Sequence, residues 1–375
     1  MSAVGRVLIV GGGIGGLSTA IALARAGIHC TIAEIETHWS VYGVGIIQPA
    51  NALRAYAQIG IVDRCLTRGF LYQRQRLYDV EGKQIGERAL PRMEGMPFYG
   101  NCGIARPILN DILVGEATSL GVDIRLGTTL VHFEDRGPHV DVELSDGMRE
   151  RFDLVIGADG LYSPLRAKLF PDAPRPVFSG QGCWRVTFEK PAEMQWSSAF
   201  YGPNRAGLIP LSQTSMYMFV TTSEPGNPRM PRDELPALLH ARLAAYSGQV
   251  AALRDSVRDP DAIVYKPLEY LLVPAPWHRG RVVLIGDAVH STTPHHAQGA
   301  AMAVEDAVVL GELLARDGNV PDLLDEFMRR RFDRCRFVVD SSIAVSELEQ
   351  SGADHAAEEA IAISERVRHG LLAPA

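Results

Sequence analysis

A glycine-rich turn between a short apolar strand and an apolar helix constrains the fold of this chain more than any other feature. Residues 6–10 (RVLIV) predict a strand, and residues 17–27 predict a helix that ends at a glycine. Residues 30–34 predict a second strand, and residues 11–16 (GGGIGG) match the pattern G-x-G-x-x-G. This order of strand, helix and strand opens a doubly wound parallel sheet, in which such a turn binds a pyrophosphate at the helix N-terminus.

The positions of this turn have separate roles. Gly11 allows the tight turn, Gly13 lets the backbone approach a pyrophosphate, and Gly16 lets the helix pack closely on the sheet. Glu34 ends the second strand about 20 residues further on and is placed to accept hydrogen bonds from an adenosine ribose. The motif predicts a dinucleotide site but leaves NAD and FAD open, because the two share an ADP half. The predicted contacts in the turn are Gly11, Gly13, Ile14, Gly15 and Gly16.

Length and composition exclude several classes of protein. A chain of 375 residues, 46% hydrophobic and 22% charged, is typical of a globular protein of roughly two domains. Its formal net charge of -7 argues against nucleic acid as a partner. Five cysteines without metal-ligand spacing predict neither a metal site nor a disulfide framework, and they favour a reducing compartment. Without a long apolar stretch or a signal-peptide pattern, we expect a soluble, cytoplasmic protein with no membrane partner.

Two later segments distinguish between the dinucleotides. Residues 153–166 (DLVIGADGLYSPLR) and 286–290 (GDAVH), the latter continued by Pro294, Gln298-Gly299 and residues 305–307, follow further predicted strands. Together with the first motif they resemble the signature set of the single-component FAD-dependent aromatic hydroxylases, the p-hydroxybenzoate hydroxylase-like group. The resemblance runs from the N-terminus to about residue 330 and selects FAD as the bound cofactor.

The resemblance also implies an architecture. It predicts an α/β fold with a Rossmann-like FAD-binding domain, an inserted and mostly antiparallel β-sheet substrate domain, and a C-terminal helical segment. We expect the last segment to contain a long amphipathic helix to about residue 350, packed on the nucleotide domain, with a membrane or partner helix as the alternative. The predicted ranges are 1–75, 98–177 and 265–321 for the FAD-binding domain, 76–97 and 178–264 for the sheet domain, and 322–375 for the helical segment.

Several FAD contacts follow from the resemblance. Asp287 is suited to accept from a ribityl hydroxyl, and the small residues Gly299, Ala300 and Ala301 open a helix whose N-terminus can stabilise negative charge on the reduced flavin. The resemblance assigns Asp159 and Arg166 to the pyrophosphate and to NAD(P)H binding, and it aims Arg106 at FAD. Surface ion pairs are the alternative for both arginines. Gly45 and Leu130 complete the implied set of cofactor contacts: Gly45, Arg106, Leu130, Asp159, Arg166, Asp287, Gly299, Ala300 and Ala301.

Several positions depart from the family pattern, including Pro49, which is displaced relative to Asn51. Ile35 follows Glu34 where the family usually has arginine, Ala297 replaces the glycine before Gln298, and Ala301 stands where asparagine or glycine is common. FAD binding is still expected, but the local flavin contacts differ from the usual ones.

The substrate side of the site is less specific. His295 and His296 follow Pro294 in the segment that the resemblance places beside the flavin, and histidine suits a base that removes a phenolic proton. The alternative is that both histidines only pack or cap the loop. His290 belongs to the motif itself and is expected to be structural.

The inserted sheet should supply the opposite wall. Strand alternation places Cys183 and Arg185 on one face, and Tyr217 and Phe219 share a face of another strand. If these faces line the site, Arg185 could pair with a substrate carboxylate. An exposed charge on a solvated sheet is the alternative.

The resemblance implies an enzyme that uses FAD, NADH or NADPH, and O2 to hydroxylate a small aromatic or N-heteroaromatic compound, such as a hydroxybenzoate or hydroxypyridine, through a flavin C4a-hydroperoxide. The alternatives are a flavoenzyme of the same fold that acts on a polycyclic compound or as a reductase, and a non-catalytic flavin-binding module. The expected state is a monomer or homodimer.

Overall fold

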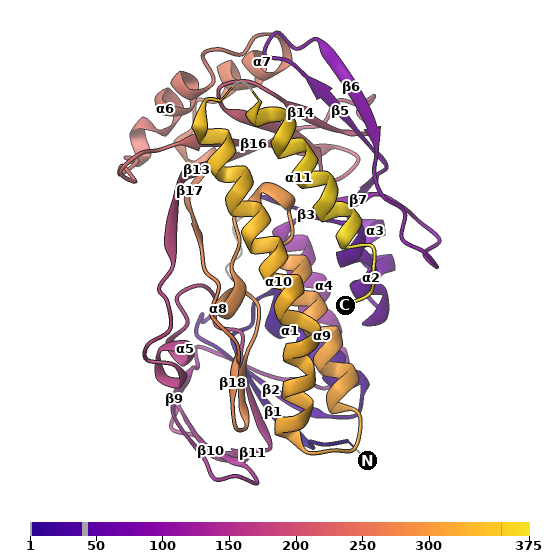
Figure 1. The fold of residues 1–375 in the computed structure, drawn as a ribbon, viewed down its shortest axis with the longest axis vertical. Helices are drawn as coiled ribbons and strands as arrows, with labels where there is room; N and C mark the ends of the chain where they lie inside the picture. Colours follow the sequence, from indigo (N-terminus) through magenta and orange to yellow (C-terminus); the bar gives the residue numbers. More distant parts are fainter. Residues whose placement is uncertain (1, 40–43, 354) are drawn as a thin grey trace.

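The computed structural model describes residues 2–39, 44–353 and 355–375. Its lower part is built on a sheet that is parallel except at one edge, in the order β18-β19-β12-β1-β2-β8 (Figure 1). The four inner strands of this order are largely buried apolar runs because helices and a second sheet cover both of their faces. Their bounds are β1 (Arg6–Val10), β2 (His29–Glu34), β8 (Asp123–Leu126), β12 (Leu154–Gly157), β18 (His278–Arg279) and β19 (Val282–Leu284).

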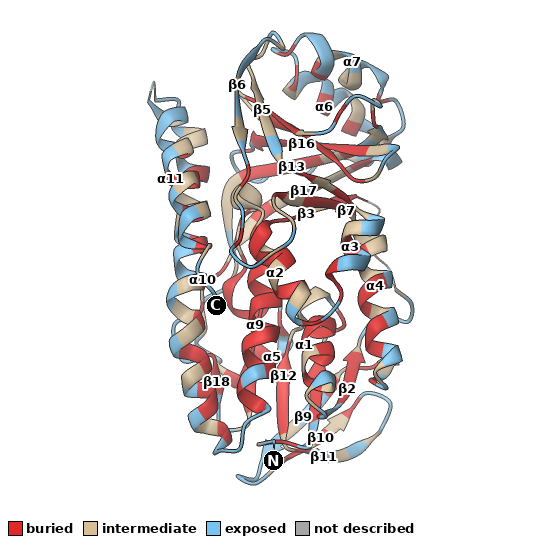
Figure 2. Ribbon diagram, turned by 90° about the vertical axis from the view of Figure 1, so that its right-hand side faces the viewer, coloured by how far each residue is buried: buried red, intermediate tan, exposed pale blue. Residues whose placement is uncertain are grey.

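Helices α1 (Ile14–Arg25), α4 (Arg106–Ser119) and α9 (Gly299–Leu314) pack together against this sheet. Figure 2 shows α1 and α9 largely buried. A three-stranded antiparallel sheet adds apolar side chains to the same core. It contains β9 (Leu130–Asp135), β10 (Val140–Leu144) and β11 (Arg149–Phe152).

The upper part is a seven-stranded sheet in the order β17-β13-β16-β15-β14-β5-β6, antiparallel except between β14 and β5. Trp184 and Val186 point into a separate apolar core shared with α6 (Leu235–Arg242) and α7 (Gly248–Ser256). The opposite face therefore turns toward the lower part, as strand alternation predicts. The strands are β5 (Arg74–Tyr78), β6 (Gln84–Ala89), β13 (Val177–Glu189), β14 (Ser197–Phe200), β15 (Arg205–Pro210), β16 (Ser215–Ser223) and β17 (Ile263–Tyr270).

Short elements connect the two parts. A small antiparallel sheet, in the order β3-β7-β4, lies beside two short helices, and its strand β7 contacts β15 of the large sheet. The predicted α/β fold with an inserted sheet is confirmed. The connecting elements are β3 (Gly45–Gln48), α2 (Ala50–Gln58), α3 (Val62–Arg68), β4 (Phe70–Tyr72) and β7 (Asn101–Ala105), and the remaining helix α5 is Pro164–Leu169.

The C-terminal helices run along both parts. The predicted long helix is α10 (Val320–Ser351), which contacts α9 and α8 (Asp287–His290) below, and β13 and the short 3₁₀ helix η3 (Pro294–His296) above. Helix α11 (Ala356–Gly370) packs against α10 (Figure 1). The expected packing on the nucleotide domain thus extends to the sheet domain. Among the described residues, no helix is both long and apolar enough to cross a membrane.

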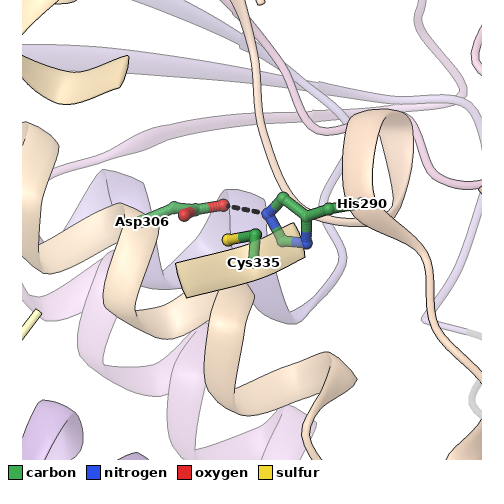
Figure 3. A group of neighbouring side chains, drawn as sticks. All are labelled: His290, Asp306 and Cys335. Atoms are coloured by element: carbon green, nitrogen blue, oxygen red, sulfur yellow. Dashed lines mark hydrogen bonds and ion pairs between the residues drawn. The ribbon is translucent and has the colours of Figure 1, made fainter. Parts of the chain in front are cut away.

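A buried ionic cluster joins α8, α9 and α10. His290 Nε2 lies 2.6 Å from Asp306 Oδ2, and the fully buried Arg331 donates from Nε to Asp306 Oδ1 and from Nη1 to Glu305 Oε2, both at 2.8 Å. Figure 3 shows His290 and Asp306 with the neighbouring Cys335. Arg331 Nη2 also lies 3.5 Å from Cys335 Sγ. Because Arg331 pairs with Asp306, its guanidinium already neutralises the carboxylate that lies beside His290 and Cys335. His290 therefore has the structural position expected for it.

Replacing Arg331 with leucine should reduce the free energy of unfolding by about 3–5 kcal/mol, because the buried Asp306 would lose its guanidinium partner. Glu305 would keep its second partner, Arg334. Denaturant unfolding of the FAD-free protein measures this loss. The matched control is Arg316→Leu, which breaks a half-exposed ion pair with Glu326 and should cost at most about 1 kcal/mol. Equal losses for the two variants would contradict the structural role given to the buried cluster.

Candidate active site

A cavity of about 640 Å³ lies between the parallel sheet and the seven-stranded sheet. Its walls come from the N-terminal ends of α1 and α9, the turn around η3, the inner face of the large sheet, and α11. The cavity opens at the carboxyl ends of the parallel strands, where α/β folds bind ligands. A cavity of this volume is large enough for a cofactor or a drug-sized ligand.

The glycine turn has the close contacts that its sequence predicts. Gly11 has φ +105°, and a Cβ there would lie 2.3 Å from the Ala158 carbonyl oxygen. A Cβ on Gly16 would lie 2.0 Å from the Gly11 oxygen. These two glycines are therefore required for packing, whereas Gly13 has no atom within 4 Å of an added Cβ and lines the cavity. Ile14 and Gly15 line it as well.

Two helix N-termini open onto the cavity. Helix α1 follows Gly13 and helix α9 follows Gln298, and neither start has a side-chain cap or an acidic residue in its first turn. The free N–H groups and the positive ends of the helix dipoles favour anionic groups at both places. Gly299, Ala300 and Asp287 line the cavity beside the second helix start.

These features fit FAD. The space in front of Gly13 and the N-terminus of α1 would hold the pyrophosphate, Asp287 would accept from the ribityl chain, and the start of α9 would lie against the flavin ring. We propose these roles from the placement of the residues on the cavity wall.

Glu34 lies at the end of β2, as the sequence predicts, but its carboxylate forms a hydrogen bond with the glycine turn. Its Oε2 accepts from the Gly12 amide at 2.6 Å, and its Oε1 accepts from the Glu36 amide at 2.9 Å. Glu34 does not belong to the cavity wall. A contact with the ribose would use the lone pairs that remain on this carboxylate.

Four other predicted cofactor residues also lie behind the wall. Arg166 is buried and donates to the carbonyls of Ala288 and Leu161, each at 2.8 Å, so it is neither a surface ion pair nor a group that lines the cavity. Asp159 accepts from the Leu165 amide at 3.0 Å, and its second oxygen is buried without a hydrogen-bond partner among the described residues. Leu130 and Ala301 are core residues.

Arg106 begins α4, and its guanidinium is no surface ion pair either. It lines the cavity, and no hydrogen bond of its guanidinium is found among the described residues. Burial and the charge of Arg185 lower the pKa of Arg106, whereas the charge of Asp287 opposes this shift. Two guanidinium groups therefore act on each other within one cavity.

The inner face of the large sheet supplies the predicted substrate wall. Arg185 is paired in register with Phe219, and Thr187 with Tyr217, so these side chains share a face with Cys183. Cys183, Arg185, Tyr217 and Phe219 all line the cavity. Gly45 lines it too, and a Cβ there would lie 2.4 Å from the Tyr217 ring, so this glycine makes room for the tyrosine. Burial raises the pKa of Tyr217 to about 12, which keeps the phenol protonated.

Pro294, His295 and His296 form η3 and line the cavity. Both ring nitrogens of His295 are engaged: Nδ1 lies 2.8 Å from Thr293 Oγ1, and Nε2 lies 3.2 Å from Glu349 Oε2. Burial lowers the pKa of His296 to about 3, so this imidazole is neutral at ordinary pH. The two neighbouring histidines therefore have different surroundings.

Sequence reasoning assigned no role to several residues that shape this site. Asn51 and Gln298 form a reciprocal side-chain pair, with N···O distances of 2.9 and 3.1 Å, that secures the start of α9. The C-terminal segment was expected only to pack, yet it contributes part of the cavity wall. No local pattern marks these positions, which are Ser364, Val367, Arg368, Leu371 and Leu372.

The chain is similar to known proteins over most of its length. Residues 5–342 match the family described as an FAD binding domain. The chain is 33% identical over 354 residues to the 2-heptyl-3-hydroxy-4(1H)-quinolone synthase of Pseudomonas aeruginosa strain UCBPP-PA14, covering 92% of this chain and 89% of that protein. It is 29% identical over 340 residues to an FAD-dependent urate hydroxylase of Klebsiella pneumoniae, covering 89% and 88%. The crystal structure of Klebsiella pneumoniae HpxO with FAD and uric acid matches with a TM-score of 0.86 at 27% identity, covering 98% of this chain and 96% of that chain.

Fold, cavity and similarity together define an FAD-dependent monooxygenase. The chain belongs to the family of FAD-dependent aromatic hydroxylases, as its motifs predict.

Replacing Asp287 with asparagine should weaken FAD binding about tenfold or more, because a hydrogen bond to a charged acceptor is lost or reversed. Titration of the FAD-free protein, followed by flavin fluorescence, measures the affinity. Asp172→Asn, at an exposed position outside the cavity wall, is the control and should bind FAD as the unaltered protein does. Unchanged affinity in Asp287→Asn would place the ribityl contact elsewhere.

Proposed function

We propose that this protein uses NADH or NADPH and O2 to hydroxylate a small aromatic or N-heteroaromatic compound. One observation carries the proposal: a single cavity is lined both by the residues that fit FAD and by the inner face of the sheet domain. A substrate ring on that face would lie directly opposite the start of α9. The urate hydroxylase and the quinolone synthase named above support a heteroaromatic substrate, since their names state such compounds.

The chemistry of the wall narrows the substrate class. Tyr217, Phe219 and Leu268 provide apolar and aromatic surface for a planar ring. Arg185 adds a cation on the same face, and among the described residues no carboxylate forms an ion pair with it. We infer that the substrate carries an acidic group, either a carboxylate or an ionised ring hydroxyl, that pairs with Arg185.

Bound FAD would supply the reduction by NAD(P)H and the activation of O2. The protein's own residues have other tasks. The two sheets and α11 enclose the ring and limit the access of water, while Arg185 orients the acidic group. A group on the wall must take the proton of a ring hydroxyl, because the ionised ring is the better nucleophile.

The two alanines at unusual positions bear on the non-catalytic alternative. Ala301 is fully buried in the core and does not line the cavity. Ala297 lines the cavity in a left-handed conformation with φ 55°, the region that favours glycine. The backbone at position 297 therefore keeps the left-handed turn that glycine would adopt, with some strain at the alanine. The preserved turn favours a functional cavity over the non-catalytic alternative.

The experiment that tests the function is aerobic oxidation of NADH and NADPH by the FAD-loaded protein, with a panel of hydroxybenzoates, hydroxypyridines, quinolones and purines. We expect at least one compound to stimulate oxidation and to yield a product heavier by one oxygen atom, identified by mass spectrometry. Stimulation without an oxygenated product, for every compound, would contradict hydroxylation. Larger polycyclic compounds added to the same panel test the alternative substrate class.

Arg185→Met tests the anionic substrate. With the compound that the panel identifies, KM should rise about tenfold or more, because a charge-assisted hydrogen bond is lost. The effect should be much smaller with an uncharged analogue of the same ring. Arg149→Met, an exposed ion-pair residue on β11, is the control and should leave KM unchanged. An equal loss for charged and uncharged compounds would contradict the pairing.

A further inference from the structure

Glu349 lies in the last turn of α10, and its carboxylate contacts His295, a residue that lines the active-site cavity. Its side chain is only 15% exposed. Oε2 accepts from Gln181 Nε2 at 3.1 Å and from Thr221 Oγ1 at 3.3 Å, and it lies 3.2 Å from His295 Nε2. Oε1 accepts from Arg205 Nη1 at 3.2 Å. One carboxylate thus joins the C-terminal helix to η3 and to three strands of the sheet domain.

His295 continues this arrangement into the cavity. While Nε2 faces Glu349, Nδ1 lies 2.8 Å from the hydroxyl oxygen of Thr293. Both Thr293 and His295 line the cavity, and the proposed function requires a proton acceptor on its wall. The three side chains therefore form a continuous hydrogen-bonded chain from α10 to the cavity wall.

We propose that Thr293 and His295 form a proton relay for the substrate hydroxyl and that Glu349 is the positioning residue that orients it. This inference rests on the proposed hydroxylation. Glu349 holds the Nε2–H side of the imidazole, so that Nδ1 presents its lone pair to the Thr293 hydroxyl.

The step is balanced as a transfer of protons alone. The substrate O–H bond breaks and its proton passes to Thr293 Oγ1, while the original hydroxyl proton of Thr293 passes to His295 Nδ1. The products are an ionised substrate ring and an imidazolium with both nitrogens protonated. The carboxylate of Glu349 stabilises that imidazolium, as a carboxylate does in other carboxylate–histidine pairs.

The surroundings keep the carboxylate charged. Burial opposes the ionisation of Glu349, but the hydrogen bond of His295 and the charge of Arg205 hold its pKa below the ordinary value. Other charged or titratable groups that interact with this site are Arg205, His296, Cys183 and Tyr246. Burial keeps His296 neutral and raises the pKa of the Cys183 thiol and the Tyr246 phenol, so that both stay protonated. Arg205 is a protonated guanidinium paired with Glu349, so it cannot accept the substrate's proton.

The first experiment compares Thr293→Val with Thr293→Ser in the FAD-loaded enzyme. Valine keeps the shape and removes the hydroxyl, so kcat should fall by about 10²-fold while KM changes little. Serine restores a hydroxyl and should restore most of kcat. Wild-type kcat in Thr293→Val, or a loss in Thr293→Ser as large as in Thr293→Val, would overturn the relay.

The second experiment needs no substrate and uses NMR of isotope-labelled histidine in the FAD-loaded protein. His295→Asn identifies the signal. In the unaltered protein the Nε2–H of His295 should appear downfield and exchange slowly with water, because it donates to a buried carboxylate. Glu349→Gln should move this signal upfield and speed its exchange. Glu326→Gln, in a surface ion pair on the same helix, should leave it unchanged.

The two proposals fail in different ways. If no compound stimulates the unaltered enzyme, the proposed function fails, whatever the NMR signal shows. If the unaltered enzyme hydroxylates a compound but the His295 signal is the same in Glu349→Gln, the positioning role of Glu349 is wrong.

Discussion

The arrangement of the site depends on the ion pairs that the buried guanidinium of Arg331 forms with Asp306 and Glu305. The guanidinium donates to Asp306 and Glu305 on α9 from its position on α10, and Asp306 also accepts from the Gly286 amide at 3.0 Å. Gly286 directly precedes Asp287, so the Asp306 carboxylate ties the segment after the parallel strand β19 to the middle of α9. The cost of burying these charges is offset only because each one is paired.

The same ion pairs explain why the C-terminal helix α10 takes part in the site. Once α10 is held against α9, its thirty-two residues extend from the FAD-binding region to the sheet domain, and its last turn carries Glu349 to His295. Helix α11 then packs back along α10 and closes one side of the cavity. The C-terminal segment, which the sequence predicts only to cover the nucleotide domain, therefore forms part of the cavity wall.

The electrostatic character of the cavity follows from the elements that meet there. Two uncapped helix N-termini contribute partial positive charge, and Arg106 and Arg185 contribute full charges. A cofactor with a pyrophosphate and a ring that becomes anionic on reduction suits this environment, as does an acidic substrate. Arg106 and Arg185 act on each other, and the charge of Asp287 opposes this effect on Arg106 without reversing it.

The amino-acid sequence by itself determined the features that depend on local sterics and periodicity. Gly11 and Gly16 indicate that backbone segments pack too closely there for any side chain. Alternation along β13 places Arg185 on the cavity face and Trp184 in the opposite core. Only the tertiary structure decided which polar groups meet. Arg166 bonds to carbonyls behind the wall, and Glu349 reaches a histidine 54 residues earlier in the chain. Such contacts arise from the packing of elements that are distant in the sequence, so the spacing of neighbouring residues cannot predict them.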